Sequence, residues 1–337
     1  MKMKKNFSLL IFVFLSLVLM TSIVFAADAD KIVFRFAHIN APEHTSNLAA
    51  VKFAELVGEK TNGRVEVQVY PAAQLGNYQE LLEGVQQGTI MFTYNTMSGF
   101  GTLYEEFGAF DTPYLFQDVD SFLKAVDLNG PLMGRLNQEL IERSGVQIIG
   151  VYFAGIRHLT LDRAIYHPDD LKGLKVRSQT YEMFTAAVEG LGAIPIPLAW
   201  SEVPTALLTG QIQGQENPYS TIWAQKVYEI QSHVMETGHI FAATGYVMNA
   251  KIFQELDADL QNAILEAAQE VTMWRTENRL EEDETCKQEC IKAGMTIITP
   301  ENGLDIEAFR ERSKALVEER FGEKYKEFYK QIDEMLK

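Results

Sequence analysis

Residues 32–70 read IVFRFAHINAPEHTSNLAAVKFAELVGEKTNGRVEVQVY, and the order of segments in this stretch decides the fold class. Residues 32–37 form a nearly continuous apolar run, which predicts a buried strand. Residues 45–60 carry apolar side chains at helical spacing. In residues 65–69 valines alternate with polar residues, as in a second strand. A strand, a helix and a strand in this order predict an α/β protein built from parallel β-α units.

The alternation continues along the chain in two series. After a helix at 78–87 and a strand near 90–94, helical segments from about 118 to 144 lead to a strand at 146–153. A second series starts near Gly155 and predicts a smaller α/β lobe. Its expected strands are 174–177 and 211–214, and its expected helices are 180–189, 201–208 and 221–231.

Residues 257–293 contain no Gly and no Pro across 37 positions. At about 1.5 Å per residue, one helix of this length would extend roughly 55 Å, which is longer than a single lobe. A kinked pair of helices is the alternative. A final amphipathic helix is expected from Ile306 to about Leu336.

The N-terminus has the pattern of a secretion signal. Three lysines precede the apolar run from Ser8 to Val24, and residues 24–26 (VFA) fit a cleavage site after Ala26. We therefore expect residues 1–26 to be a cleaved signal peptide. An uncleaved anchor is the alternative, although the run is short for a membrane span.

The length and net charge of the exported chain limit the classes of partner that it can bind. Cleavage removes three lysines and no acid, so the formal charge changes from −16 to −19 in a mature chain of 311 residues. A chain of this length favours two lobes over one core. The acidic surface argues against nucleic acid or anionic lipid as a partner, and a site for an anion must carry its own cations.

No motif indicates catalysis, a metal or a cofactor. The six histidines lack metal-ligand spacing, and the chain has no G-x-S-x-G elbow or phosphate-binding glycine loop. We therefore do not predict an enzyme. The only cysteines, Cys286 and Cys290, lie four residues apart in a helical run. A disulfide and two free thiols remain open, and the lack of an accompanying Cys/His cluster argues against half of a zinc site.

Two arginines are candidates for binding an anion. Arg177 ends the strand LKV, and Arg157 follows VYFAG, so both lie where ligands bind in open α/β sheets. A guanidinium stays charged and donates two parallel hydrogen bonds to a carboxylate. The alternative is that each arginine pairs with one of the 46 acidic residues.

Other candidates lie near predicted strand ends. Asn217 follows the strand QIQG within the motif Q-E-N-P, where its amide can contact a ligand or stabilise a turn. Trp200 and Tyr94 are aromatic residues that can line a pocket or belong to the core.

Together these segments resemble the solute-binding subunit of tripartite ATP-independent periplasmic (TRAP) transporters, of the DctP type. The resemblance covers most of the mature chain. It is carried by FAELVGEKTNGRVEVQVYPAAQLG (53–76), DTPYLF (111–116), GIRHLT (155–160), DLKGLKVR (170–177) and SEVPTALLTGQIQGQENPYSTIWAQKVYEIQ (201–231). The last three, in that order and spacing, are highly specific.

The resemblance implies a two-lobe α/β periplasmic binding protein, type II-like, with a long helix spanning both lobes. Lobe I would comprise residues 27–154 plus 243–282, and lobe II residues 155–242 plus 283–337. The long helix agrees with the Gly- and Pro-free run.

The resemblance also implies residue roles. Arg177 would form the main bidentate salt bridge to a ligand carboxylate, and Arg157 would supply a second positive contact. Asn217 would bond the same ligand and Trp200 would pack near it. The remaining predicted ligand-binding residues are Glu216 of the Q-E-N-P motif, Tyr94 and Asn95 of the segment Tyr94-Asn95-Thr96, His38, Glu43 and Asn77.

The family implies a receptor that captures a small organic-acid anion between its lobes. No acidic residue lies near Thr96, which argues against sialic acid, and the hydroxyl and amide of Tyr94 and Asn95 suit a hydroxylated acid. A sugar acid is the first expectation, followed by a dicarboxylate or a keto acid. The expected partners are the small and large integral-membrane subunits of an ion-gradient-driven transporter. This chain is expected to be a monomer in the periplasm. A periplasmic sensor that feeds a signalling receptor is the alternative function.

Overall fold

The computed structural model describes residues 31–336, and the predicted signal peptide lies outside them. Nine strands lie in the described residues: β1 (Ile32–Ala37), β2 (Val65–Tyr70), β3 (Phe92–Thr96), β4 (Val146–Leu161), β5 (Lys175–Ser178), β6 (Ile194–Pro197), β7 (Gly214–Asn217), β8 (His233–Asn249) and β9 (Thr296–Ile298). The helices are α2 (Thr45–Lys60), α3 (Tyr78–Gln87), α4 (Met97–Phe100), α5 (Val119–Val126), α6 (Pro131–Ser144), α7 (Glu182–Leu191), α8 (Val203–Leu208), α9 (Tyr219–Ala224), α10 (Ala250–Glu255), α11 (Ala258–Lys292), α12 (Ile306–Phe321) and α13 (Lys326–Met335).

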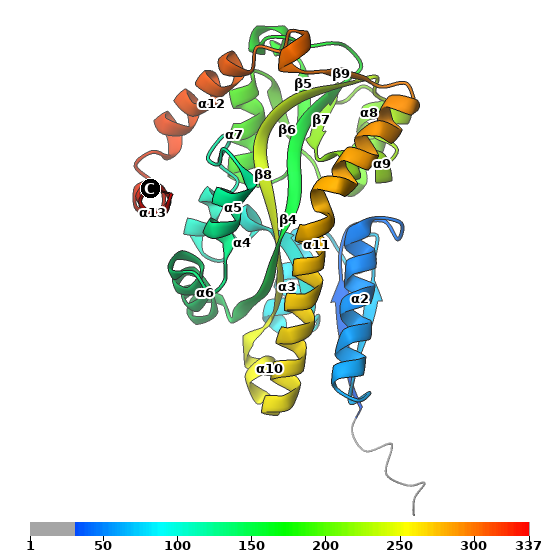
Figure 1. Cartoon of the computed structure of the whole chain (residues 1–337), viewed down its shortest axis with the longest axis vertical. Coiled ribbons are helices and arrows are strands. Elements are labelled where there is room, and N and C mark those ends of the chain that lie inside the picture. The colour runs from blue at the N-terminus through cyan, green and yellow to red at the C-terminus, as the bar shows by residue number, and fades with distance from the viewer. Residues whose placement is uncertain (1–30, 337) are drawn as a thin grey trace, which may run out of the picture.

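One mixed sheet runs through both lobes in the order β2-β1-β3-β8-β4-β7-β5-β6, and β9 pairs with β8 (Figure 1). The outer strands are parallel, with β1 beside β2 and β3, and β5 beside β6 and β7. The central pairs β3–β8, β8–β4 and β4–β7 are antiparallel. The prediction of parallel β-α units is therefore confirmed for the outer strands and wrong for the centre of the sheet.

Two long strands connect the lobes. β4 has 16 residues and β8 has 17, and they pair antiparallel along most of their length (Figure 1). The prediction ended the β4 strand at Phe153 and did not include β8. The chain instead continues through Gly155, where the register with β8 shifts and φ is +102°. Glycine adopts that φ without strain, so the strand bulges there and does not end.

Gly155 is also a point of close approach to α11. A Cβ atom at this position would lie 2.7 Å from Nε of Arg279 and closer still to a carboxylate oxygen of Asp283. We expect Gly155→Ala to lower the free energy of unfolding by about 1–3 kcal/mol, through the unfavourable φ and the overpacking. Urea denaturation of the two proteins measures this. Gly145→Ala is the control, because φ is +71° there and nothing lies within 4 Å of the added Cβ. Equal losses at both sites would show that overpacking at Gly155 contributes nothing.

The Gly- and Pro-free run forms one helix. α11 has 35 residues, extends about 52 Å, and packs against β4, α2 and α9, elements of both series (Figure 1). The first half of its buried face is apolar and includes Ala267, Ala268 and Val271, whose small or branched side chains allow close packing. The same face continues with Arg275 and Arg279, each only 2% exposed. The expectation of a long helix spanning both lobes is confirmed.

Three elements of the second series begin or end at other residues than predicted. α8 begins at Val203 and follows a 3₁₀ turn at Trp200–Glu202, because Pro204 has no N–H and suits a first helical turn. β7 begins at Gly214, where pairing with β4 starts, and not at 211. α9 ends at Ala224, and Lys226 has a positive φ of 53° that breaks the predicted helix 221–231.

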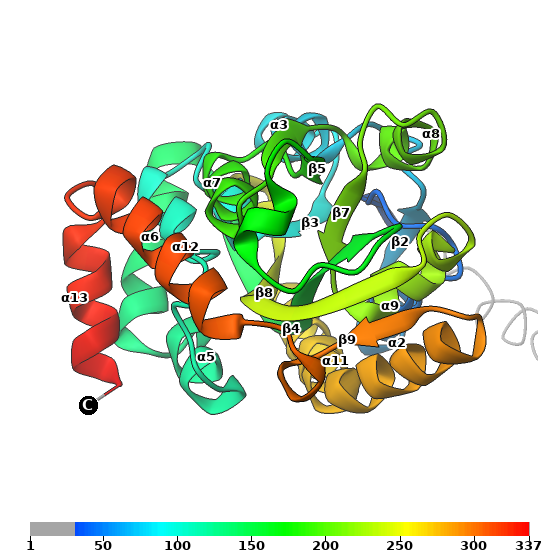
Figure 2. The same cartoon turned by 90° about the horizontal axis from the view of Figure 1, so that it is seen from above.

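The hydrophobic cores lie on both faces of the sheet. From above, α5, α6, α12 and α13 gather on one side and α2 and α11 on the other (Figure 2). α13 packs against residues from the first half of the chain, since the rings of Phe328 and Phe110 have centroids 4.8 Å apart. The C-terminus is therefore tied to the first series as well as to the second.

Both cysteines are free thiols, and burial raises their pKa to about 12, which makes them poor nucleophiles. Among residues 31–336, no helix has the length and hydropathy needed to span a membrane.

Candidate functional site

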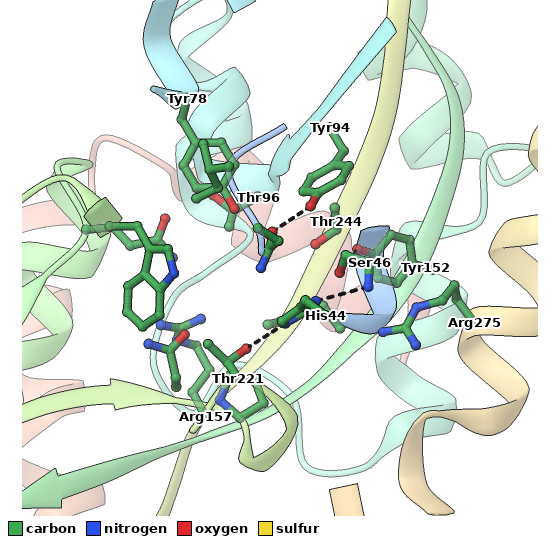
Figure 3. Close-up of a pocket in the computed structure, with 18 of the residues that line it drawn as sticks. His44, Ser46, Tyr78, Tyr94, Thr96, Tyr152, Arg157, Thr221, Thr244 and Arg275 are labelled. Atoms are coloured by element: carbon green, nitrogen blue, oxygen red, sulfur yellow. Dashed lines mark hydrogen bonds between the residues drawn. The ribbon is translucent and has the colours of Figure 1, made fainter. Parts of the chain in front are cut away.

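A cavity of about 70 Å³ lies where the two halves of the sheet meet. Its walls come from β3, β4 and β8, from the loops after β1, β5 and β7, and from α11 (Figure 3). Four arginines line it: Arg157, Arg177, Arg275 and Arg279. A small space with this many cations is suited to an oxygen-rich anion.

Arg177 enters the pocket from β5 and is 4% exposed. Its Nε and Nη2 donate to the carbonyl oxygen of Leu198 at 3.1 and 3.0 Å, and its guanidinium stacks 5.3 Å from the ring centroid of Trp200. Within the described chain, no carboxylate forms an ion pair with it. Burial lowers the pKa of Arg177 to about 10, so the side chain stays positive at neutral pH. Arg177 is a fixed and uncompensated buried cation.

Arg157 lines the same pocket but has an internal partner. Its Nη2 donates to Oε1 of Glu216 at 2.8 Å, and its Nε donates to Oε2. Glu216 is fully buried and also lies 3.2 Å from Nε2 of His239. Burial alone would raise the pKa of Glu216, but the attraction of Arg157 and the hydrogen bonds lower it to about 2. The Arg157 charge is therefore compensated within the protein.

Asn217 and Trp200 complete the wall beside these arginines. Asn217 ends β7, lines the cavity, and its Nδ2 donates to Oε1 of Gln215 at 2.5 Å. Trp200 precedes α8 and contacts both this cavity and a second one of about 130 Å³ near Asn77 and Tyr78. The indole holds the Arg177 guanidinium in place as well as bordering the pocket.

The residues of the first series divide between the pocket and its surroundings. Tyr94 lines the cavity, and its hydroxyl donates to Oδ1 of Asn40 at 2.5 Å (Figure 3). Behind it, the His38 ring stacks on Tyr94 at 5.2 Å between centroids and bonds Asn47, and burial lowers its pKa to about 4. Asn95 is buried and bonds the Tyr181 hydroxyl at 2.9 Å.

The predicted residues are therefore only partly brought together. Five line the main cavity: Arg157, Arg177, Asn217, Trp200 and Tyr94. Asn77 caps α3 and borders the second cavity. Glu216, His38 and Asn95 lie behind lining residues and do not border the cavity, and Glu43 is exposed on the loop before α2.

His44 closes the pocket from the first series. As the cap of α2 its Nδ1 accepts from the N–H of Ser46 at 3.0 Å, which places the ring proton on Nε2. That nitrogen is 3.4 Å from the hydroxyl of Thr221 on α9 (Figure 3). Burial and the nearby arginines lower the pKa of His44 to about 3, so the ring is neutral. This contact joins elements from the two series across the pocket.

Sequence reasoning missed several lining residues. Gln179 lies two residues after Arg177 in the segment SQTY, on the same edge of the sheet, and that position was the available signal. Arg275 and Arg279 lie four residues apart in α11; Arg275 precedes the strongly acidic run ENRLEEDE (277–284) and Arg279 lies within it. Two arginines at this spacing share a helix face, but nothing in the sequence says that the face is buried.

The described residues contain no cluster of His, Cys, Asp and Glu arranged to hold a metal.

The chain matches the DctP family model, bacterial extracellular solute-binding protein family 7, over residues 36–324. The chain belongs to this family. Its members are solute receptors outside the cytoplasm and not a class of enzymes.

Relatives within the DctP family bind different acids. The C4-dicarboxylate-binding periplasmic protein DctP of Rhodobacter capsulatus is 33% identical over 80% of each chain. The 2,3-diketo-L-gulonate-binding periplasmic protein YiaO of Escherichia coli K12 is 31% identical over 82% of each. A TRAP periplasmic solute-binding protein from Roseobacter denitrificans, solved with bound L-galactonate, superimposes with a TM-score of 0.83 at 28% identity, covering 90% of this chain and 99% of that one.

Proposed function

We propose that this protein captures a small organic-acid anion between its two lobes and delivers it to the membrane subunits of a TRAP transporter driven by an ion gradient. One observation carries the proposal. Arg177 is a buried cation in a pocket, it has no carboxylate partner in the described chain, and its guanidinium is fixed by Leu198 and Trp200. Burial of such a group is unfavourable unless an anion neutralises it.

The proposed ligand is a sugar acid, with a dicarboxylate or a keto acid as the next candidates. Support comes from the hydroxyl and amide groups of Tyr94, Asn217 and Gln179 along the cavity, which suit ligand hydroxyl groups. The ligands of the DctP relatives, a C4-dicarboxylate, a diketo sugar acid and L-galactonate, belong to the same three classes.

Each predicted residue then has a proposed role. Arg177 pairs with the carboxylate, and Arg157, Asn217, Trp200 and Tyr94 contact the ligand from the cavity walls. Glu216 and His38 hold Arg157 and Tyr94 in position through the contacts described above. Asn95, Asn77 and Glu43 lie around the cleft and not in its wall. Asn95 is hydrogen-bonded to Tyr181 behind the lining residues.

Closure follows from the same charges. We assign residues 27–154 plus 243–282 to lobe I and 155–242 plus 283–337 to lobe II, with the crossing strands β4 and β8 as the hinge. Closing the cleft without ligand would leave Arg177 buried and unpaired, which is unfavourable. The ligand carboxylate removes that penalty and so shifts the equilibrium to the closed form that the membrane subunits receive.

The next proposals concern the location and oligomeric state of the protein. We propose that the chain reaches the periplasm, that its signal peptide is cleaved near Ala26, and that it acts there as a monomer without catalysing turnover of its ligand. Membership of an extracellular solute-binding family supports the exported location and the role as a binding protein.

A thermal-shift screen of organic acids tests the binding function. An acid at 100 times its dissociation constant stabilises the protein by about 2.7 kcal/mol, which raises Tm by several degrees. We expect carboxylates to give this shift and the corresponding neutral sugars to give none. A screen in which no acid raises Tm would contradict the proposal. Uptake into vesicles that contain the two membrane subunits, dependent on added protein, tests delivery.

A further inference from the structure

Arg275 and Arg279 form a second polar end of the pocket. They project from successive turns of α11, are each 2% exposed, and line the cavity together with Arg177. Arg275 enters from the side opposite Arg157 and lies against Tyr152, with its guanidinium 5.3 Å from that ring centroid (Figure 3). The pocket is therefore bounded by arginines at both ends.

The two ends differ in charge. Arg275 Nη1 and Arg279 Nη1 lie 2.9 and 3.3 Å from Oε2 of Glu282, and Arg279 Nη2 lies 3.1 Å from Oδ1 of Asp283. Arg157 is paired with Glu216. The four arginines thus face three carboxylates, and the remaining positive charge is at Arg177.

The α11 end nevertheless keeps unused hydrogen-bond donors. Nε and Nη2 of Arg275 and Nε of Arg279 are shielded from solvent and have no hydrogen-bond partner in the described chain. Buried acceptor-capable atoms of the pocket, Gln179 Oε1 and Thr96 Oγ1, are also without partners. Five of the nine such atoms in the described residues thus belong to this pocket. Buried donors without partners are strongly unfavourable, so an acceptor is expected beside them.

We propose that the ligand is a monocarboxylate with a hydroxylated tail, whose carboxylate pairs with Arg177 and whose tail oxygens accept hydrogen bonds from Arg275 and Arg279. The proposal rests on the function proposed above and narrows its ligand class. It also assigns two specificity residues that the sequence motifs do not include.

A second carboxylate fits this end poorly. Because Glu282 and Asp283 already compensate Arg275 and Arg279, a ligand carboxylate there would be a buried charge in excess. Neutral hydroxyl oxygens meet the free N–H groups without adding charge. A dicarboxylate would have to leave its second group in water or displace an internal ion pair.

Matched acids test the proposal on the unaltered protein. We would measure affinities by calorimetry for a four-carbon set (erythronate, butyrate, succinate) and a six-carbon set (galactonate, hexanoate, galactarate). In at least one set the hydroxylated monoacid should bind at least tenfold more tightly than both the unsubstituted acid and the diacid. If acids bind but the diacid is equal or better in both sets, the inference is overturned while the proposed function stands. If no acid binds, the proposed function itself fails.

Arg275→Lys tests the residue directly. Lysine keeps the positive charge near Glu282 but lacks the planar guanidinium that provides the free Nε and Nη2 donors. We expect the affinity for the preferred hydroxylated acid to fall about 10- to 100-fold, while that for the unsubstituted acid of equal length changes less than threefold. Arg320→Lys on α12, exposed and paired with Glu189, is the matched control and should change neither.

Equal losses for both acids in Arg275→Lys would assign Arg275 a general structural role and overturn the proposal, as would no loss for either acid. The melting temperature of each unliganded variant shows whether folding is intact. If Arg275→Lys fails to fold, the acid series on the unaltered protein still decides between the outcomes.

Discussion

Arg177→Ala removes carboxylate binding while the protein stays folded. Deleting one partner of a buried charge pair costs about 3–5 kcal/mol, which corresponds to a loss of roughly 150- to 5000-fold in affinity. The ligand would keep its hydrogen bonds in the rest of the pocket but would bury its carboxylate without a cation. Isothermal titration of the preferred acid into the variant and the unaltered protein measures the loss.

Two controls separate binding from folding in this experiment. The unliganded variant should be as stable as the unaltered protein or more stable, because Arg177 is buried there without a carboxylate partner. Arg177→Lys should also bind weakly, since an ammonium cannot replace the planar donor held by Leu198 and Trp200. Unchanged affinity in Arg177→Ala would remove the central argument for an anion site.

Glu216→Gln should destabilise the protein by about 3–5 kcal/mol at neutral pH. The substitution keeps the size of the side chain but leaves Arg157 as a buried cation without its carboxylate. Urea denaturation at pH 7 measures the change. The double variant Arg157→Met/Glu216→Leu should recover most of the loss, because two apolar residues can replace a buried pair at little cost. If the double variant is as unstable as the single one, loss of packing and not of charge is the cause.

The same carboxylate makes stability depend on pH. Burial acts to raise the pKa of Glu216, but Arg157 and His239 lower it to about 2 from the ordinary 4.5. A pKa that is lower in the folded state stabilises the protein fully above about pH 5, and the contribution is lost as pH falls towards 2. The shift corresponds to roughly 3 kcal/mol. Melting curves should therefore show a weaker dependence on pH between 5 and 2 in Glu216→Gln than in the unaltered protein.

The sequence predicts the outer parts of the fold well because their signals are local. Apolar runs, helical periodicity and the absence of Gly and Pro in 257–293 all act over a few neighbouring residues. The central strands depend on distant pairing. β8 pairs with β4 and β3, which lie far away along the chain, and β4 continues past Gly155 only because that pairing holds it. No local pattern contains this information.

The roles of the two sequence-predicted arginines differ for the same reason. Arg157 and Arg177 both follow apolar strands and look equivalent in sequence. The antiparallel register that pairs Leu159 with Glu216 brings a carboxylate to Arg157, and no register brings one to Arg177 in the described chain. Which arginine is compensated could therefore be learned only from the folded structure. The burial of Arg275 and Arg279 likewise depends on where α11 crosses the sheet.

The unbroken length of α11 has a mechanical consequence. With 35 residues, each half of the helix is a lever of about 26 Å. A bend of about 10° at its middle would displace one end by roughly 4–5 Å, enough to change which atoms touch across the pocket. Arg275 lies at that midpoint and Arg279 one turn beyond it, where the displacement is smallest. Ligand atoms bound to these two arginines would therefore move little, while the two ends of α11 and the elements packed against them are displaced by several ångströms.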